Sequence, residues 1–382
     1  MKRIVYLGYY DTLNGGTDVV LSATNKMDYI IDSLVEIGLR VDIVSPSILK
    51  KRSWERGSYK RIGENVFLKK FSSFFAGTRF GCVLTRRIVY KELEKYLNKE
   101  LRTGDTLLVY HSLGYLKLPQ KLKRKKNIKL IYEVEEIYSD VGNTKITREE
   151  ELLAFKEADA FLVPAKSLNN TVNENGKPTV FIHGVYKVEK KCAEKFDDGR
   201  IHCVYAGTFD KTKGGALAAI QAAEFLNEKY CLHILGFGGE QDICLVRSEI
   251  EKIKTISKCD IVYHGLLKGE EYTAFLQKCH IGLSTQAPSG IYNETSFPSK
   301  ILSYLSNGLL VVTVNIPVVK ESSIGNIVYY YEEQTAKSIA SAIMQAANNV
   351  QDNARNVLDA LDDKFKADLQ ELINNLKENI DG

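Results

Sequence analysis

Two short apolar runs near the start of the chain decide the fold: residues 3–8 read RIVYLG, and residues 41–45 read VDIVS. Such runs are typical of strands buried on both faces of a parallel sheet. Between them, residues 19–38 carry apolar side chains at helical spacing and end in Gly38, which suits a helix terminus. This order predicts a strand, a crossover helix and a second, parallel strand with a right-handed connection.

The same alternation of apolar runs and amphipathic stretches continues along the chain. Further strands are predicted at 106–110, 129–133 and 160–164, and then at 200–207, 231–236, 260–264, 280–284 and 309–314. We therefore predict an α/β protein with two Rossmann-like, doubly wound domains facing a central cleft. The predicted parts are an N-terminal domain (1–185), a linker (186–199), a C-terminal domain (200–345) and C-terminal helices (346–382) that pack back on the N-terminal domain.

Length and composition agree with two folded domains. The 382 residues are 44% hydrophobic and include only 7 Pro, which argues against a long disordered region. No apolar run reaches about 18 residues, so neither a membrane span nor a signal peptide is expected. The 7 Cys are odd in number and form no CxxC or CxxH pair. This pattern predicts a reduced, cytoplasmic protein without a metal site.

The net charge of +4 conceals a segregation of charge along the chain. Residues 50–130, called the basic segment below, hold 22 Lys and Arg against 6 Asp and Glu, a net charge of +16 that leaves −12 elsewhere. Its aromatic residues include Trp54, Tyr59, Phe67, Phe71, Phe74, Phe75, Phe80 and Tyr90, and residues 121–126 read KLKRKK. Bases with exposed aromatics suit an anionic membrane surface or a lipid diphosphate-linked acceptor. Nucleic acid competes as a partner, but no nucleic-acid-binding motif accompanies the charge.

A glycine-containing loop follows the first predicted strand of each domain. The first holds Gly15, Gly16 and Thr17, and the second, at residues 207–215, holds Thr208, Lys211 and Lys213. Glycine lets the backbone approach a ligand, and helix-start N–H groups or lysines favour a diphosphate. The first loop lacks the dinucleotide and P-loop patterns. At this point a two-domain sugar transferase, a periplasmic-type binding protein and a nucleotide-dependent dehydrogenase all remain open.

The most informative run is NETSFPSKILSYLSNGLLVV at residues 293–312. It predicts a helix that opens at Phe297 and Pro298 and ends at Gly308, before a buried strand. The side chains and N–H groups near the helix start would then form a phosphate site with Lys300. The residues of this predicted site are Thr295, Ser296, Ser299 and Lys300.

This run resembles a helix of nucleotide-sugar-dependent glycosyltransferases of the GT-B architecture, especially family 4 and related bacterial polysaccharide glycosyltransferases. Their recurring pattern is P-[ST]-K-hydrophobic-x-E-Y-hydrophobic-[AS]-x-G-x-P-V. Further stretches resemble the family in the expected order: the Gly15–Gly16 pair, YHS (110–112), NGKP (175–178), IHGV (182–185), AGT (206–208), GFG (236–238) and YHGL (263–266). Two positions depart from the pattern: Ser303 replaces a ribose-binding Glu, and Thr295, next to Glu294, replaces a frequent carboxylate.

The resemblance implies transfer of a sugar from a nucleotide diphosphate sugar, with a UDP-sugar favoured, usually with retention and without a metal or other cofactor. It implies a glycan or lipid-linked acceptor in polysaccharide or cell-envelope biosynthesis, and a cytoplasmic protein that can be peripheral at the inner face of the plasma membrane. Lys300 and either Lys211 or Lys213 would neutralise the diphosphate leaving group, and Gly16 and Thr17 would donate N–H groups to it. The implied donor-binding residues are Gly15, Gly16, Thr17, Thr208, Lys211, Lys213, Gly238, Leu266, Thr295, Ser296, Phe297, Pro298, Ser299 and Ser303.

Two further catalytic candidates follow strands of the N-terminal domain. His111 is expected to face the cleft, where it can bind the donor sugar or transfer a proton. Glu133, Glu135 and Glu136 follow the next strand, and we select Glu135 to orient an acceptor hydroxyl. A histidine bonded to the backbone and an acidic helix start are the competing interpretations. Because Ser303 replaces the usual Glu, a noncatalytic sugar-nucleotide or glycan-binding protein remains an alternative, and a phosphorylase is a third.

Overall fold

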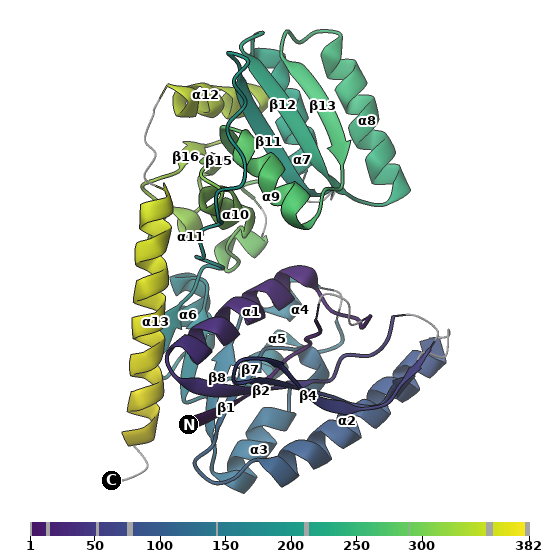
Figure 1. Cartoon of the computed structure of the whole chain (residues 1–382), viewed down its shortest axis with the longest axis vertical. Helices are drawn as coiled ribbons and strands as arrows, with labels where there is room; N and C mark the ends of the chain where they lie inside the picture. Colours follow the sequence, from purple (N-terminus) through teal and green to yellow (C-terminus); the bar gives the residue numbers. More distant parts are fainter. Residues whose placement is uncertain are drawn as a thin grey trace. The chain divides into compact units, whose positions relative to one another are not determined.

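The chain forms two compact units, which are described separately. The computed structural model describes residues 2–12, 16–50, 53–74, 79–142, 144–209, 214–289, 291–348 and 354–378. The first unit comprises Met1–Val185 and Lys364–Gly382, and the second comprises Tyr186–Asp363. Figure 1 colours the chain along the sequence and labels helices and strands where there is room.

The first unit is built on an eight-stranded sheet in the order β10-β9-β8-β7-β1-β2-β5-β4. All neighbours are parallel except β4 and β5. The strands are β1 (Lys2–Leu7), β2 (Leu39–Ser45), β4 (Ser58–Gly63), β5 (Val66–Lys70), β7 (Thr106–Tyr110), β8 (Lys129–Glu133), β9 (Ala160–Val163) and β10 (Thr179–Phe181). A separate antiparallel pair joins β3 (Trp54–Glu55) to β6 (Ser73–Phe74).

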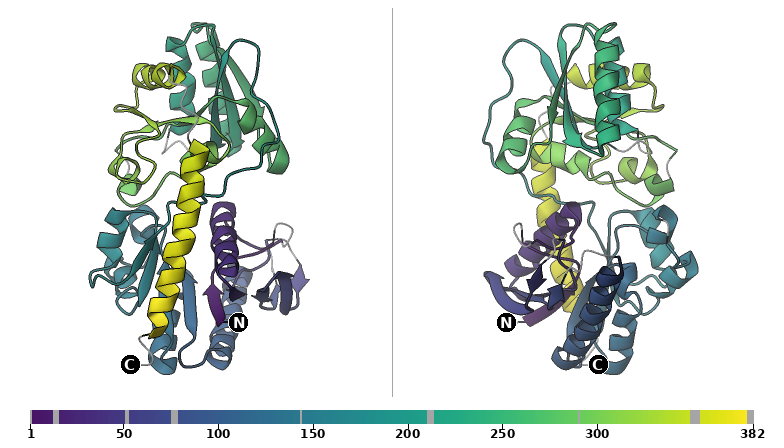
Figure 2. Two further views of the ribbon diagram at one scale, coloured as in Figure 1. Left: turned by 60° about the vertical axis from the view of Figure 1, so that its left-hand side comes forward. Right: turned by 90° about the vertical axis from the view of Figure 1, so that its right-hand side faces the viewer.

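Helices and the end of the chain complete the first unit. They are α1 (Leu21–Glu36), α2 (Arg79–Glu100), η1 (Leu113–Tyr115), α3 (Leu118–Lys126), α4 (Tyr138–Val141), α5 (Arg148–Leu153) and α6 (Lys166–Val172). The last helix, α13 (Ala354–Glu378), contributes its part from Lys364 onward. There Phe365 stacks on Tyr29 of α1 with ring centroids 5.4 Å apart, and Lys366 pairs with Glu36 at 2.6 Å. Figure 2 shows α13 running beside this unit.

The second unit has a six-stranded, wholly parallel sheet in the order β13-β12-β11-β14-β15-β16. Its strands are β11 (Ile201–Thr208), β12 (Tyr230–Phe237), β13 (Asp260–Gly265), β14 (Ile281–Ser284), β15 (Leu310–Val314) and β16 (Tyr329–Tyr331). Its helices are α7 (Gly215–Ala222), η2 (Ala223–Phe225), α8 (Glu240–Lys254), α9 (Gly269–Lys278), η3 (Ile291–Glu294), α10 (Lys300–Ser306), α11 (Pro317–Lys320) and α12 (Ala336–Ala347).

Both sheets reverse their strand order at one point. In the first unit the order reverses between β1 and β7, and in the second between β11 and β14. In open α/β sheets, ligands bind outside the carboxyl ends of the strands at such a switch point. The topology therefore predicts ligand sites at the carboxyl ends of β1 and β7 and of β11 and β14.

The predicted strands agree with the structure, but several boundaries do not. Residues 186–199, predicted as a linker, are bonded to the second unit: the Phe196 N–H donates to the Lys278 carbonyl at 2.9 Å, and that of Glu189 to the Ser306 carbonyl at 3.1 Å. The helix predicted to open at Phe297 and Pro298 begins instead at Lys300. Ser299 is therefore the N-cap of the helix and residues 295–298 precede it, and their contact with a phosphate group stays a prediction.

Candidate functional site

The carboxyl edge of the second sheet presents several of the predicted donor-binding residues. Thr208 ends β11 and is exposed. Leu266 follows β13 and is 47% exposed, and Phe237, the last residue of β12, is 52% exposed. Exposed large apolar side chains at the ends of neighbouring parallel strands offer a surface for a planar ligand group such as a nucleobase. Lys211 and Lys213, which belong to the same predicted loop, lie outside the described residues.

Lys300 reaches this edge from the first residue of α10. Its Nζ lies 2.9 Å from the Tyr205 hydroxyl and 4.2 Å from the centre of that ring. The side chain passes directly over the backbone of Gly207, because a Cβ added there would lie 2.2 Å from the Lys300 Cε. The absence of a side chain at residue 207 is thus what lets the ammonium group approach the end of β11, next to the switch point.

Two further glycines set the shape of this edge. A Cβ on Gly236 would lie 1.9 Å from the Gly207 carbonyl oxygen, and its φ of 151° disfavours other residues. A Cβ on Gly238, a predicted donor-binding residue, would lie 3.0 Å from the Phe209 Cβ and 3.1 Å from the Asp242 Cβ. Close packing therefore already explains a glycine at 238, and its contact with a donor stays a prediction.

The segment before α10 is only partly accessible. Phe297 is buried at 7% exposure, Ser299 is exposed, and Thr295, Ser296 and Pro298 are half-buried. Ser303 lies one turn after Lys300, half-buried, with its Oγ 3.5 Å from the Tyr272 hydroxyl. Residues three apart share one helix face. Ser303 and Lys300 therefore lie on the same face of α10, and the serine side chain is uncharged.

The first glycine loop differs from its predicted arrangement. Gly15 lies outside the described residues, and Gly16 has a positive φ of 74°. Thr17 is buried, with its Oγ1 donating to Asp11 Oδ2 at 2.6 Å and its N–H to the same oxygen at 3.3 Å. Because α1 begins only at Leu21, the Thr17 N–H is not a helix-start donor, and it is already bonded to a carboxylate that pairs with Lys70 at 3.2 Å.

His111 follows β7 as predicted but does not face open solvent. Its side chain is 1% exposed, packs on Phe155 with ring centroids 4.8 Å apart, and bonds through Nε2 to Glu151 Oε1 at 2.7 Å. Burial raises the Glu151 pKa, but hydrogen bonds from His111 and from the backbone N–H groups of Ser139 and Tyr138 outweigh it and lower that pKa. The expectation of a cleft-facing histidine is wrong, because the ring is enclosed within its own unit.

Glu133 is the most perturbed carboxyl group of the first unit. It ends β8, is fully buried and accepts a hydrogen bond from the Tyr6 hydroxyl. Burial, followed by the nearby charge of Glu135, raises its pKa to about 8. Among the described residues, its Oε1 and the Nδ1 of His111 have no hydrogen-bond partner. Unpaired buried polar atoms are uncommon in folded proteins, and both lie at the end of the sheet where ligands are expected.

Glu135 lies two residues beyond Glu133 and is about one quarter exposed at its side chain. It pairs with Lys26 of α1, which is itself buried and also donates to the Ile182 carbonyl at 3.0 Å. A carboxylate held by a buried lysine yet open to solvent is placed to orient a ligand hydroxyl.

Sequence reasoning missed Lys26, Glu151 and Tyr205. The sequence does indicate that Lys26 is buried, because it stands at helical spacing from Ala23 and Ile30, on the face of α1 that was predicted to be apolar. A lysine on a buried helix face requires a partner. Glu151 and Tyr205 gave no comparable signal, since their roles depend on residues distant in the sequence.

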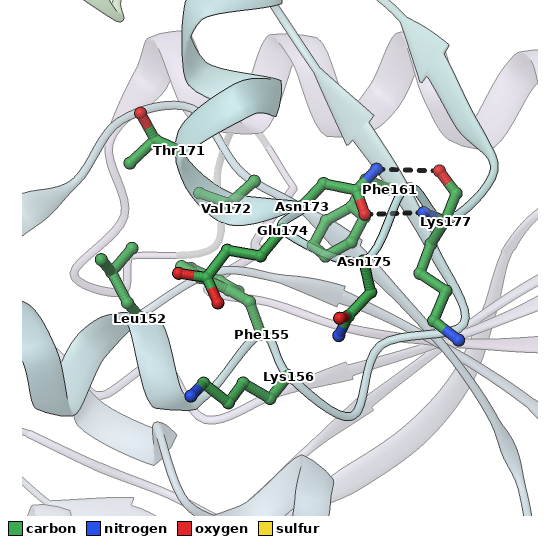
Figure 3. Close-up of a pocket in the computed structure, with 10 residues that line it drawn as sticks. All are labelled: Leu152, Phe155, Lys156, Phe161, Thr171, Val172, Asn173, Glu174, Asn175 and Lys177. Atoms are coloured by element: carbon green, nitrogen blue, oxygen red, sulfur yellow. Dashed lines mark hydrogen bonds between the residues drawn. The ribbon is translucent and has the colours of Figure 1, made fainter.

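A small pocket lies elsewhere in the first unit, beside α6 (Figure 3). Its lining includes Asn173, whose amide donates to the Lys177 carbonyl at 2.8 Å and accepts from the Lys177 N–H at 2.7 Å. These bonds close the turn of the NGKP motif. We therefore assign this motif a structural role at the pocket rim.

Comparison with known proteins defines first a class of fold. Two doubly wound α/β units, with mostly parallel sheets that each reverse at a switch point, are typical of the GT-B architecture, and solved GT-B structures match nearly the whole chain. No protein-family profile matches the sequence, and no curated protein is significantly similar to it. Among the helices of the described ranges, none combines the length and apolarity needed to cross a bilayer.

The particular structures are synthases of phosphorylated disaccharides. A sucrose-phosphate synthase from Thermosynechococcus elongatus matches with a TM-score of 0.67 and 12% identity, covering 98% of this chain and 99% of that one. An α,α-trehalose 6-phosphate synthase from Burkholderia multivorans matches at 0.66 and 11%, covering 99% and 97%. An E. coli trehalose-6-phosphate structure bound with UDP-2-fluoro glucose matches at 0.66 and 11%, covering 98% and 99%. The predicted GT-B fold is confirmed, whereas the narrower resemblance to family 4 is not.

Proposed function

We propose that this protein is a glycosyltransferase that moves a sugar from a nucleotide diphosphate sugar, with a UDP-sugar favoured, to a glycan or lipid-linked acceptor. The observation that carries this proposal is Lys300 over Gly207 at the carboxyl edge of the second sheet. An ammonium group held at a topological switch point suits the diphosphate of a donor. The structures similar in fold include UDP-forming synthases and one bound with UDP-2-fluoro glucose, which supports a UDP-sugar.

We propose the following chemical step for this placement of Lys300. The oxygen of an acceptor hydroxyl forms a bond to the anomeric carbon, and the bond from that carbon to the diphosphate oxygen breaks. The electron pair of the broken bond goes to the diphosphate, where the Lys300 charge stabilises it. The hydroxyl proton goes to the leaving diphosphate oxygen, and an attack from the leaving-group face retains configuration. Glu135 orients the acceptor hydroxyl. His111 is buried and does not touch the sugar; it holds Glu151, which accepts hydrogen bonds from the Tyr138 and Ser139 N–H groups.

The donor contacts at the remaining positions belong to the same proposal. Thr208, Leu266 and Ser303 lie where a nucleotide could contact them from the ends of β11 and β13 and from α10. Serine at 303 can donate one neutral hydrogen bond to a ribose, about half as strong as a charge-assisted one. We therefore expect weak base-side and ribose-side binding, with most of the affinity arising at the diphosphate.

We further propose that the acceptor side contacts an anionic membrane at the cytoplasmic face, in polysaccharide or cell-envelope biosynthesis. The first half of α2 supports this, because its outer face is apolar: Phe80, Val83, Leu84 and Ile88 are 79%, 48%, 42% and 38% exposed. Arg87 and Lys91 are exposed on the same helix. An apolar stripe flanked by bases is typical of interfacial helices. Trp54, 67% exposed on β3, pairs with Phe74, whose carbonyl accepts from Thr85 of α2 at 2.7 Å.

Residues 121–126 contribute less to this surface than their charge suggests. Lys121 pairs with Glu94 at 2.5 Å, Lys123 with Asp159 at 2.7 Å, and Arg124 with Glu157. Three of the five bases in this run are thus partly neutralised within their own unit. The proposed membrane contact therefore rests on α2 and not on α3.

The function is tested by incubating the full chain with UDP-, GDP- and ADP-sugars and measuring release of the nucleoside diphosphate. Separate arms contain no acceptor, glucose 6-phosphate, or a lipid-linked acceptor, so that a soluble and a membrane-borne phosphate can be told apart. We expect acceptor-dependent release from a UDP-sugar. A thermal shift with UDP but no release in any arm would instead support a noncatalytic binding protein, and release of sugar phosphate from a glycan with inorganic phosphate would support a phosphorylase.

A further inference from the structure

A histidine chain crosses the second sheet on the side where residues 186–199 are bonded. His202 Nδ1 lies 2.8 Å from His233 Nε2, and His233 Nδ1 lies 2.9 Å from His264 Nε2. The chain ends at Asp198, whose Oδ1 lies 2.9 Å from His202 Nε2. Cys231 is the strand neighbour of His202, since their Cα atoms are partners between β11 and β12. One ligand atom from each of His202, Cys231 and His233 lies within 4.8 Å of the others, and all three residues are buried.

The hydrogen bonds fix which ring nitrogens face the cluster. A carboxylate only accepts, so His202 carries its proton on Nε2 and leaves the Nδ1 lone pair directed at His233. On the far side of His233, Nδ1 is held by His264. Each of the two histidines thus has one nitrogen in the cluster and its other nitrogen bonded to a partner. That is the arrangement by which proteins orient histidine ligands of a metal.

Stacking holds the same rings in place. Phe196 lies on His202 with centroids 4.2 Å apart and an interplanar angle of 25°, and on His233 at 5.5 Å. Phe275 of α9 meets the His233 ring edge-on at 5.2 Å. The ligand atoms are therefore positioned before any ion arrives, which lowers the entropic cost of binding one.

We propose that His202 Nδ1, Cys231 Sγ and His233 Nε2 bind one Zn²⁺ ion, with Asp198 and His264 as positioning residues. Two nitrogens and a thiolate are a ligand set that zinc prefers. Zinc–nitrogen bonds of about 2.0–2.1 Å place two ligating nitrogens about 3.3 Å apart in a tetrahedral site. The observed 2.8 Å between the two nitrogens therefore has to widen by only about 0.5 Å. A fourth ligand, such as a water molecule, would complete a tetrahedral site.

The protons balance in a simple way. Binding releases one proton, from the Cys231 thiol. The His233 proton moves from Nε2 to Nδ1, where His264 Nε2 accepts it in a hydrogen bond, and His264 then carries its own proton on Nδ1. All three histidines remain neutral, as metal ligands must. The ion would tie β11 to β12 and, through Asp198, hold residues 186–199 on the sheet.

The test uses the full chain after removal of metals with a chelator, titrated with Co²⁺ as a spectroscopic probe and then with Zn²⁺. We expect one ion per chain, a thiolate-to-cobalt charge-transfer band that Zn²⁺ abolishes, and a higher thermal midpoint with Zn²⁺. Cys231→Ser keeps the size of the side chain, and should lose the band and bind at least tenfold more weakly. Asp198→Ala should weaken binding by about 10–100-fold while keeping the band. Cys244→Ser, at an exposed cysteine of α8, is the matched control and should behave as wild type.

Two results would overturn the proposal. One is a wild-type protein that shows neither the charge-transfer band nor a thermal shift. The other is a Cys231→Ser variant that binds Co²⁺ as the wild type does, because binding would then reside on other side chains. Circular dichroism of each variant establishes that it is folded. The result is independent of the proposed transfer reaction, because no step of that reaction uses the ion.

Discussion

The Lys300 ammonium group lies 2.9 Å from the hydroxyl of Tyr205 and above its ring, at 4.2 Å from the ring centre. Tyr205 belongs to β11 and Lys300 begins α10, so the contact joins the two segments of the second unit that the donor diphosphate is proposed to meet. The hydroxyl and the ring face of Tyr205 hold the Lys300 side chain at the end of β11. The charge is thereby positioned for an anion.

Gly207→Ala should displace this lysine. The new Cβ would lie 2.2 Å from the Lys300 Cε, so the lysine side chain must shift. Misplacing a catalytic group by about 1 Å can cost about 10²-fold in rate, and we expect a loss of that order in nucleotide release. Gly63→Ala is the control, because its Cβ would meet only Val66 at 3.5 Å. Equal turnover in the two variants would show that the position of Lys300 over residue 207 does not matter.

The pair formed by Lys26 and Glu135 should behave as a coupled unit. Glu135→Ala leaves the Lys26 ammonium buried with the Ile182 carbonyl as a remaining acceptor. Losing one partner of a fully buried pair costs about 3–5 kcal/mol, and we expect about 1–3 kcal/mol here because Glu135 is partly exposed. Lys26→Met combined with Glu135→Ala should recover most of that loss in urea unfolding. Additive losses in the double variant would contradict the coupling.

Glu133 should make the stability of the protein depend on pH. Its pKa is about 8 in the folded protein, above the ordinary value of 4.5, so its contribution is fully present below about pH 4.5 and is lost as the pH rises toward 8. Glu133→Gln keeps an acceptor for Tyr6 and removes the titration. The free energy of unfolding, measured by urea denaturation from about pH 5 to pH 8, should therefore fall more steeply with pH for the wild type than for Glu133→Gln, by up to about 1.4 kcal/mol per pH unit. Glu174→Gln, at an exposed site, should follow the wild type; parallel profiles for all three proteins would rule the assignment out.

The outer face of α2 should bind anionic vesicles. Phe80→Ser and Leu84→Ser each remove an exposed apolar side chain worth about 1.5–3 kcal/mol when fully buried, so each should weaken binding to phosphatidylglycerol vesicles about tenfold. Arg87→Glu should weaken vesicle binding more at low salt than at high salt, because salt screens exposed charges. Ile256→Ser removes an apolar residue of the second unit whose exposure, 57%, lies between those of Phe80 and Leu84, and serves as the control. Vesicle binding that responds alike to Leu84→Ser and Ile256→Ser would exclude α2 as the contact.

The sequence predicts the sheets better than the contacts between distant residues. The runs at 106–110 and 129–133 coincide with β7 and β8, because strands covered on both faces must be continuously apolar. The strands between residues 54 and 74 escaped prediction: β4, for example, is mostly exposed at the edge of the sheet and lacks such a run. Within the candidate site, the position of Glu135 just after a strand could be inferred from the sequence, whereas the approach of Lys300 to β11 depends on its contacts with Gly207 and Tyr205.

What the sequence could not predict is pairing across long separations. Lys26 and Glu135 are 109 residues apart, and their contact depends on how α1 packs at the end of β8. His202 and Cys231 become neighbours only through the register of β11 with β12, so a search for closely spaced metal-ligand motifs overlooks them. The burial of His111 follows from Phe155 and Glu151, which lie in a later helical region. Each case needs a tertiary contact that local spacing does not encode.

The most direct test of the proposed donor site is calorimetric titration of the full chain with UDP, in the wild type, in Lys300→Ala and in Lys320→Ala, an exposed control lysine on α11. We predict one saturable site in the wild type and in Lys320→Ala, and binding about 10–100-fold weaker in Lys300→Ala, because a charge-assisted hydrogen bond contributes about 1.5–3 kcal/mol. The absence of saturable UDP binding in the wild type, or equal affinity in the wild type and Lys300→Ala, would contradict a donor site at Lys300.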